Sequence, residues 1–460
     1  MSSSGTSGTS NLNSGTLNKK TKIFLTDYPY KKDIENRLFL SDLSIFEVEV
    51  LQEILNSSIK IPVSDLCKAL DCETEVLAPV LDKFGRTGLL MRQNDSIFVD
   101  KDLRKYYEFH INKFDDNFEP NLEFMLGLLN KVPIPIIPTW YNISKTSDNI
   151  FASLIEKYFL TPKIYEKHLS DLVFTEPALN AIVRDLFASK ELKITTDELR
   201  KKYSLSKEKL EELIVQLEFH LALCLSYNKH NGKWKGVITP LHEWRELLEF
   251  QEKTKPVPLS NKEAVVKSHP VEDFAFILDL QDFLKKVQQG KLKNSDLPKD
   301  ETIITAALKL DFVERTQGKI KAKLDPESYL SMSLPDQSMY LYRQTLSDIV
   351  RNSTYSFEAV EKSFREVERS LKRVLTTGWL LFEDFMRGLI SPIGSAEPVT
   401  LKKVGKKWRY TLPIYSDEDK EFLEMMIFGP LYQAGVIATG TYKGKPCFMV
   451  TAYGKIALGD

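Results

Sequence analysis

FGPLYQAGVI, residues 428–437, and PCFMVTAYGKIAL, residues 446–458, are the stretches from which the fold of this chain can be inferred. They predict the end of an apolar helix, a stop at Gly435, a short strand, a turn rich in Gly and Lys, and a second strand. Glycine suits the helix end and the turn because both need a positive φ angle, which glycine adopts without steric penalty. The segment is therefore predicted to be a helix followed by a β-hairpin.

The same order of helix end, strand, turn and strand recurs at three earlier places, residues 82–99, 216–238 and 306–321. Three helices followed by a hairpin is the plan of a winged helix, and recurrence along a chain indicates tandem copies. We therefore predict a mainly α fold with small β-hairpins (α+β), organised as tandem winged-helix domains.

Length and composition set outer bounds on this prediction. The chain has 460 residues, which is enough for about three or four domains. Its formal net charge of −1 indicates no particular partner. No apolar run approaches the roughly 18 residues that a membrane span needs, and residues 1–16 lack the apolar core of a secretory signal. The four cysteines have apolar neighbours and form no CxxC pair, so we expect a reduced, cytoplasmic protein with core thiols and no zinc site.

Composition shifts and predicted helix starts divide the chain into seven segments. The prolines and polar residues of 251–270 separate two halves, each with two winged-helix units. The predicted segments are a flexible tail (1–32), winged helix 1 (33–118), a helical segment with a Pro-rich strap (119–174), winged helix 2 (175–250), a linker (251–270), a reduced winged helix 3 (271–333) and winged helix 4 with extra helices (334–460).

Two local patterns support these assignments. Ser44 with Glu47, and Thr195 with Glu198, have the spacing of capping boxes, in which a side-chain oxygen and a backbone amide satisfy each other reciprocally at a helix start. Residues 132–140 contain three prolines, which remove amide donors, so an extended strap over a domain surface is expected there. The alternative for this strap is a docking peptide for a partner.

The helix before each hairpin bears on function, because in a DNA-reading winged helix it enters the major groove. In the first unit this helix is predicted over 74–85, and its carboxylates include Glu75 and Asp82. Phosphate repels such a face, which favours packing against protein. In the second unit Glu208, Glu211 and Glu212 alternate with lysines, as on a solvated helix face.

Basic hairpins are the candidate nucleic-acid contacts, because cations on a strand face suit phosphate oxygens. In the third unit, period-2 spacing places three lysines on one strand face. In the last unit, residues 401–410 form a predicted hairpin with the densest basic cluster of the chain. The candidate binding residues are Arg315, Lys319, Lys321, Lys323, Lys402, Lys403, Lys406, Lys407, Trp408 and Arg409. A third basic hairpin, 229–235, has the competing explanation that lysines protect sheet edges from pairing.

Sequence motifs of catalysis and nucleotide binding were not found. There is no GxxxxGK[ST] loop, no GxGxxG after a strand, no HExxH and no GxSxG, and the six histidines are dispersed. We therefore expect no enzymatic activity, no catalytic residues, no metal and no cofactor.

Four further features of the sequence form a pattern: Trp379 followed by Glu383, Asp384 and Phe385, a predicted helix end at 430–437, the closing segment 448–458 and a predicted helix-turn-helix over 51–90. This pattern resembles that of bacterial helicase-associated proteins that carry the XPB-type helicase N-terminal domain. The resemblance extends over roughly two-thirds of the chain and implies stacked winged helices. The sequence ends at Asp460, where that family continues into a helicase-like domain, so helicase activity is not expected here.

These observations lead to two functional hypotheses. The first is a non-enzymatic, DNA-associated protein whose basic hairpins contact the nucleic-acid backbone without sequence specificity, or which joins a DNA-processing complex. The alternative is a winged-helix scaffold for protein–protein interaction with no direct DNA contact. Neither hypothesis involves a membrane.

Overall fold

The computed structural model describes residues 22–290, 297–352, 357–390, 392–394, 397–405 and 407–459. The fold is mainly α, with small antiparallel sheets of two to four strands. The chain divides into two compact units. The first comprises residues 1–245 and 406–408, and the second comprises residues 246–405 and 409–460.

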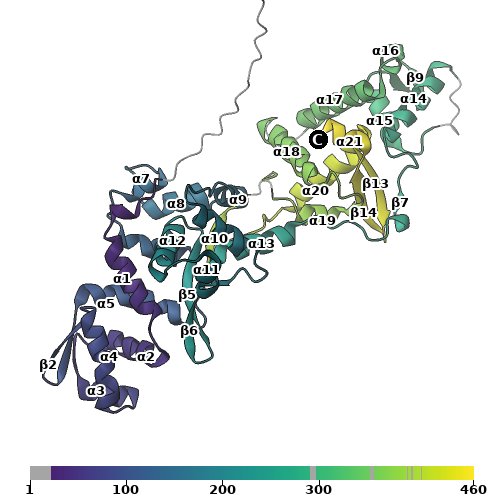
Figure 1. Ribbon diagram of the computed structural model, residues 1–460. Coiled ribbons are helices and arrows are strands. Elements are labelled where there is room, and N and C mark those ends of the chain that lie inside the picture. The colour runs from purple at the N-terminus through teal and green to yellow at the C-terminus, as the bar shows by residue number, and fades with distance from the viewer. Residues whose placement is uncertain are drawn as a thin grey trace, which may run out of the picture. The chain divides into compact units, whose positions relative to one another are not determined.

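The first unit opens with α1 (Tyr30–Ser41), which precedes a segment that we call the first repeat, residues 45–99 (Figure 1). In this repeat a short strand follows the first helix and pairs with the last strand, so the sheet order is β1-β3-β2. Its elements are α2 (Ile45–Asn56), β1 (Lys60–Pro62), α3 (Val63–Leu70), α4 (Thr74–Arg86), β2 (Leu90–Gln93) and β3 (Ser96–Val99).

The second repeat, residues 177–240, has the same order of elements and the equivalent sheet, β4-β6-β5. Its elements are α10 (Pro177–Ala188), β4 (Ile194–Thr195), α11 (Thr196–Tyr203), α12 (Lys207–Phe219), β5 (Leu223–His230) and β6 (Lys233–Pro240). Between the two repeats lie α5 (Lys101–His110), α6 (Leu122–Leu128), α7 (Ile137–Tyr141), α8 (Ile150–Tyr158) and α9 (Pro162–Ser170), and α13 (His242–Thr254) follows the second repeat.

In the second unit, the third predicted winged helix is a helix pair with a two-stranded hairpin. It consists of α14 (Ala275–Gln288), α15 (Glu301–Lys309), β8 (Val313–Thr316) and β9 (Lys319–Ala322), and α16 (Glu327–Leu330) and α17 (Leu334–Asn352) follow.

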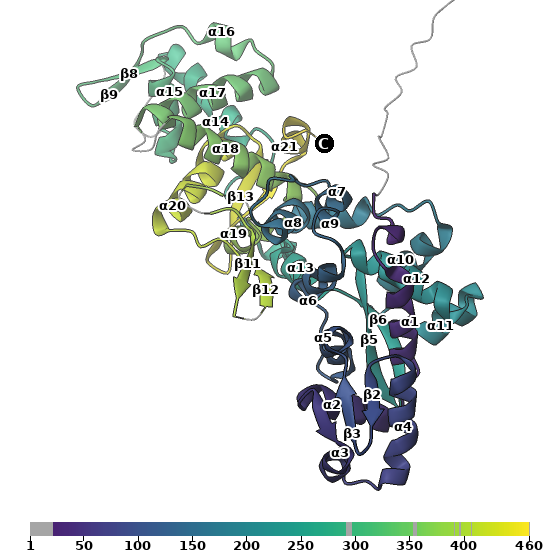
Figure 2. The same ribbon diagram turned by 90° about the vertical axis from the view of Figure 1, so that its left-hand side faces the viewer.

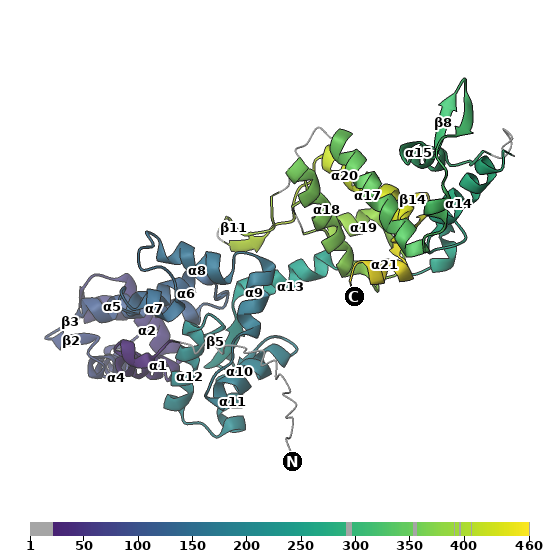
Figure 3. The same ribbon diagram turned by 90° about the horizontal axis from the view of Figure 1, so that it is seen from above.

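The last repeat, residues 357–450, again places a short strand beside the final strand, in the sheet order β10-β14-β13-β7. The first helix of this repeat packs against α17 and against the helix that precedes the final hairpin (Figure 3). Its elements are α18 (Phe357–Leu371), β10 (Leu380–Leu381), α19 (Phe382–Arg387), α20 (Asp417–Met426), β13 (Ile437–Tyr442) and β14 (Lys445–Val450). A further hairpin, β11 (Leu401–Val404) and β12 (Lys407–Tyr410), lies between α19 and α20, and α21 (Ala452–Ala457) follows the repeat.

The capping predictions are confirmed. Ser44 and Glu47 form a capping box at α2, and Thr195 and Glu198 form one at α11. The glycine prediction also holds for Gly435, whose φ is +69° at the turn before β13. These features are local, so neighbouring residues alone determine them.

The extended strap predicted for residues 132–140 is wrong over most of its length, because residues 134–136 form a turn and a helix follows. α7 begins at Ile137, and Pro138 lies within its first turn, where a missing amide costs nothing because such amides have no intrahelical acceptor. Trp140, on the same helix, donates from Nε1 to Oδ2 of Asp27 at 2.7 Å. Ile134, in the first half of the same segment, is 71% exposed, so this side chain does not pack onto a domain surface.

Three further expectations need correction. Residues 30–32 belong to α1, so the predicted tail does not extend over all of 1–32; residues 1–21 lie outside the described part of the chain. The predicted linker 251–270 contains the end of α13 and strand β7 (Val266–Lys267), which pairs with β13. The helix predicted to contain Trp379 begins only at Phe382, and Trp379 lies outside it, directly before strand β10, which pairs with β14.

The cores of the two units are organised differently. In the first unit one continuous cluster joins both repeats, including Leu51 and Leu81 from the first repeat and Ile182 and Leu213 from the second. In the second unit the helix pair α14–α15 and the last repeat have separate clusters. The two repeats of the first unit are therefore fused into one hydrophobic body.

Candidate interaction surfaces

The β8–β9 hairpin presents a partly unpaired basic face. Cross-strand pairing sets Lys321 opposite Glu314 and Lys319 opposite Thr316, so the lysines of β9 share one face, as predicted. Lys319 and Lys321 are exposed and form no ion pair with the residues that the structure describes, whereas Lys323 pairs with Asp311 at 2.8 Å. Figure 2 shows this hairpin standing out from the adjoining helices.

Arg315 lies on the opposite face of the same hairpin, since it pairs with Ile320. Its side chain is exposed and, within the described chain, has no carboxylate partner. The four cations predicted for this hairpin are therefore divided between two faces, and one of them is neutralised.

The β11–β12 hairpin, predicted as the densest basic cluster, is largely neutralised by carboxylates. Within the second unit, Lys402 pairs with Glu397 at 2.5 Å and Arg409 pairs with Glu246 at 3.3 Å. Within the first unit, Lys407 pairs with Glu119 at 2.8 Å. Because each ammonium or guanidinium already has a counter-ion, contact with a phosphate would first have to break these pairs.

The remaining predicted residues of this hairpin add little to a nucleic-acid surface. The indole Nε1 of Trp408 is buried, and the ring is half-buried, so it is not a fully open stacking platform. Lys403 is exposed but has an interaction with another part of the protein. Lys406 lies outside the described residues.

Helix α4 of the first repeat exposes an acidic face, as predicted. Leu77, Val80, Leu81 and Phe84 are buried on its inner side. Glu75 and Asp82 are exposed on its outer side, where Val76 is 54% exposed. An acidic helix face with an exposed apolar residue is repelled by phosphate and suits a protein partner.

Helix α20 of the last repeat is more acidic still. Its first turn holds Asp417, Glu418 and Asp419, and Glu421 and Glu424 are exposed further along. The single lysine of the helix is matched by a carboxylate of that helix, at 2.8 Å. This helix also presents negative charge where a DNA-reading helix would need positive charge.

Helix α12 of the second repeat is not a solvated helix, contrary to the prediction. Eight of its thirteen residues are buried, among them Glu211 and Glu218. It packs against α1, α10, α11 and α6 within the first unit. The sequence prediction failed because the counter-ions of these two glutamates come from residues more than a hundred positions away.

Those counter-ions form a buried ionic network that sequence reasoning missed. Arg37 of α1 donates from Nε to Oε2 of Glu211 at 2.9 Å and from a terminal nitrogen to Oε2 of Glu218 at 2.8 Å. Lys113 donates to Oε1 of Glu218 at 3.0 Å. Burial opposes ionisation of Glu218, but Arg37 and Lys113 outweigh it and hold the pKa of this carboxyl well below its usual range.

A second part of the network is centred on Asp33, which accepts hydrogen bonds from Tyr28, Tyr106 and Lys131 at 2.7–2.9 Å. Burial disfavours the Asp33 carboxylate, yet Lys131 and Arg37 lower its pKa. Burial lowers the pKa of Lys131 to about 8. Each carboxylate here is bound by several protein donors, as in a structural network that fixes helix orientation.

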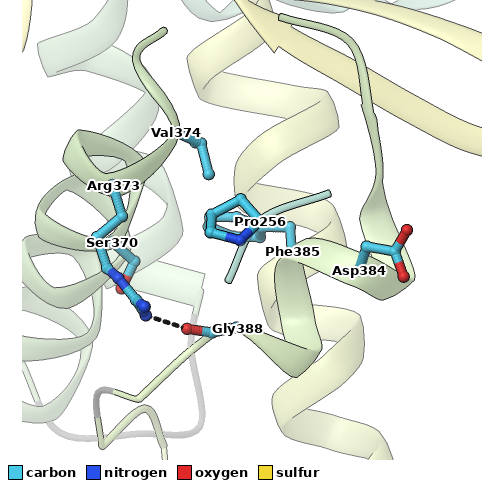
Figure 4. A pocket seen from close by; sticks show the side chains of 7 residues that line it. All are labelled: Pro256, Ser370, Arg373, Val374, Asp384, Phe385 and Gly388. Carbon is cyan, nitrogen blue, oxygen red and sulfur yellow. Dashed lines mark hydrogen bonds between the residues drawn. The ribbon is translucent and has the colours of Figure 1, made fainter. Parts of the chain in front are cut away.

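A small pocket in the second unit offers no clear ligand site (Figure 4). Its cavity volume of about 10 Å³ is room for about one water molecule and lies far below the roughly 300–1,000 Å³ of small-molecule sites. The Arg373 guanidinium donates to the carbonyl of Gly388 and, at 3.4 Å, to that of Thr254. The pocket is lined by Pro256, Ser370, Arg373, Val374, Asp384, Phe385 and Gly388.

Two searches of the described residues were negative. No group of three or more His, Cys, Asp or Glu side chains is placed to hold a metal ion in that part of the chain. None of the helices in the described ranges is long and apolar enough to cross a membrane.

Comparison with known proteins adds no relative to this picture. No protein-family model matches the chain, and a search of curated proteins found no significant match.

Proposed function

We propose that this chain is a non-enzymatic, cytoplasmic scaffold for protein–protein interaction, built from tandem winged-helix repeats. The observation that carries the proposal is the state of the helix before the hairpin in the three complete repeats. Helices α4 and α20 direct carboxylates outward, and α12 is mostly buried. A protein that read DNA through these helices would need a basic, accessible face on at least one of them.

The assignment of the repeats as winged helices rests on their shared topology. Each has helix, short strand, two helices and a hairpin, and each short strand pairs with the last strand. The resemblance to helicase-associated proteins is compatible with this topology and remains a proposal. It favours a partner within a DNA-processing assembly, and the acidic faces favour one with a basic surface.

A binding experiment in two arms tests the proposal. In the first, fluorescence anisotropy with a random duplex at 50–200 mM salt should show little binding by the full chain. In the second, proteins retained by the full chain at physiological salt are compared with those retained by Glu75→Lys/Asp82→Lys. We expect the double variant to lose a stoichiometric partner. Tight duplex binding without any protein partner would contradict the scaffold function.

The second candidate function is contact with a nucleic-acid backbone, and the specific observation behind it is the unpaired state of Arg315, Lys319 and Lys321. With about three phosphate contacts, the logarithm of affinity should fall with the logarithm of salt with a slope of about −3. Lys319→Glu/Lys321→Glu should abolish such binding.

The matched control is Lys402→Glu/Lys407→Glu on the other basic hairpin, whose cations are already paired. If the control weakened duplex binding more than the β9 variant, the densest cluster in sequence would be the site after all. No measurable binding at 50 mM salt by the unmodified chain would remove this second candidate.

A further inference from the structure

Two cysteines lie together at the end of α3 in the first repeat. Cys67 is in the last full turn of the helix, and Cys72 follows the helix end at Asp71. Both side chains are free thiols of intermediate exposure and pack at the margin of the hydrophobic core. Cys224 and Cys447, in contrast, are fully buried.

The helix end places the two cysteines against each other. Asp71 adopts a left-handed conformation with φ of +48°, and the Cys67 carbonyl accepts the amides of both Asp71 and Cys72, the latter at 3.1 Å. The bond from Cys72 spans five residues, as in a Schellman motif, in which the side chains at these two positions are frequently in contact. This backbone hydrogen bond of 3.1 Å brings the two residues close together, as a disulfide requires.

The electrostatic surroundings agree with adjoining thiols. Partial burial and the neighbouring Cys67 thiol raise the pKa of Cys72, and the carboxylates of Glu73 and Asp71 add to the effect. Sγ of Cys67 also lies 3.6 Å from the hydroxyl of Thr74, the first residue of α4. Carboxylates repel anionic reagents, so a cationic disulfide is the reagent class best suited to this site.

We propose that Cys67 and Cys72 form a modification site, a thiol pair that closes reversibly to an intramolecular disulfide by exchange with a cationic low-molecular-weight disulfide. One thiolate attacks the reagent disulfide, forms a mixed disulfide and releases one reagent thiol. The second thiolate then attacks the protein sulfur of that mixed disulfide and releases the second reagent thiol. The two protein thiols lose two protons and two electrons, and the reagent disulfide accepts them.

The covalent link would join the last turn of α3 to the residue before the N-cap of α4. It would therefore restrain the turn between two helices of the first repeat, next to the acidic face of α4. The inference does not depend on what partner this face binds.

The test is intact-protein mass spectrometry of the full chain treated with cystamine under native conditions at pH 8. The native chain should lose about 2 Da, and peptide mapping should find a Cys67–Cys72 link. Cys67→Ser and Cys72→Ser have no second thiol at the site, so each should instead accumulate one adduct of about 75 Da. Dithiothreitol should reverse all of these changes.

Circular dichroism establishes that the variants are folded, and Cys447→Ser is the control that should close like the native chain. Two stable adducts on the native chain would show that the thiols react separately and would overturn the proposal. A link to another cysteine, or no reaction at either residue within hours, would also overturn it.

Discussion

Helices α12 and α20 occupy the same place in their repeats but have opposite surroundings. Eight of the thirteen residues of α12 are buried, whereas only three of the ten residues of α20 are. Both helices are rich in glutamate. In α12, Glu211 and Glu218 point into the unit and meet Arg37 and Lys113. In α20, Glu421 and Glu424 face solvent.

The difference shows that one topological position can serve as core or as surface. In the first unit, α1 packs against α12 and supplies Arg37, which is 2% exposed and pairs with Glu211. A buried charge is tolerated only when its partners are also present and hydrogen-bonded. Glu211 and Glu218 of α12 therefore fix an arrangement of helices, whereas Glu421 and Glu424 of α20 are exposed to solvent.

The largest loss of stability is expected from breaking the buried ion pairs of α12. Glu218→Gln keeps the side-chain size but leaves Lys113 without a carboxylate and Arg37 with only Glu211. Removing one member of such a network typically costs about 3–5 kcal/mol. Urea unfolding of the full chain, followed by hydrogen exchange in peptides of each unit, should place the loss in residues 22–245. A loss below about 1 kcal/mol would mean that the network is not buried in solution.

The second largest effect is expected from acid, which should destabilise the first unit more than the second. Burial lowers the pKa of His168 and of His220 to about 4, and burial also places the pKa of His110 below its usual range. These histidines stay neutral in the folded first unit while their unfolded counterparts gain protons below about pH 6.5. The contribution of these histidines to the free energy of unfolding is therefore fully present above pH 6.5. It is lost as the pH drops toward 4, by up to about 1.4 kcal/mol per pH unit for each histidine.

Hydrogen exchange measured between pH 7.5 and 4.5 checks this order of unfolding. The first unit should open at a higher pH than the second, and His168→Gln should reduce the difference. Equal sensitivity of the two units to acid would contradict the assignment of neutral, buried histidines.

Removing the N-cap hydroxyl should lower the free energy of unfolding by a smaller amount, and by the same amount in α12 and α20. The hydroxyl of Ser206 accepts the amide of Lys209 at 3.0 Å, and that of Ser416 accepts the amide of Asp419 at 3.1 Å. Ser206→Ala and Ser416→Ala should each cost about 1 kcal/mol, because a cap acts on its own first turn. A large difference in the unfolding free energies of the two variants would show that burial of the helix does influence its cap.

The smallest change in stability is expected from a substitution on the exposed face of α20. Glu421→Gln, the counterpart of the Glu218 variant, removes an exposed carboxylate and should change the free energy of unfolding by less than about 0.5 kcal/mol. Its urea midpoint should match that of the unmodified chain. A loss comparable to that of Glu218→Gln would mean that α20 is covered in solution.

The features that sequence predicted correctly are those with short-range causes. Ser44 and Thr195 cap the predicted helices, and the hairpin lysines of β9 share one face because of strand alternation. The prediction for the Pro-rich segment 132–140 was wrong for a related reason. The positions of its prolines exclude a helix interior but not a helix start, and residue type alone does not tell the two apart.

The candidate site was predicted in part. The exposed state of Arg315, Lys319 and Lys321 agrees with the prediction. The cluster around Lys402 and Lys407 has the same kind of sequence but is paired with carboxylates, one of them from residue 119. The sequence shows how many cations a hairpin carries. Binding to phosphate, however, depends on the cations that have no carboxylate partner after folding.

Sequence by itself determined the elements of this protein: helix starts, turns, hairpins and the recurrence of one order of elements, all set by residues a few positions apart. Only the tertiary structure decided which faces of those elements are covered. Arg37 reaches Glu218 across 181 positions of sequence, and no local pattern in α12 indicates that such a partner exists. Burial and charge pairing depend on long-range packing, so the distinction between the core helix α12 and the exposed helix α20 appears only in three dimensions.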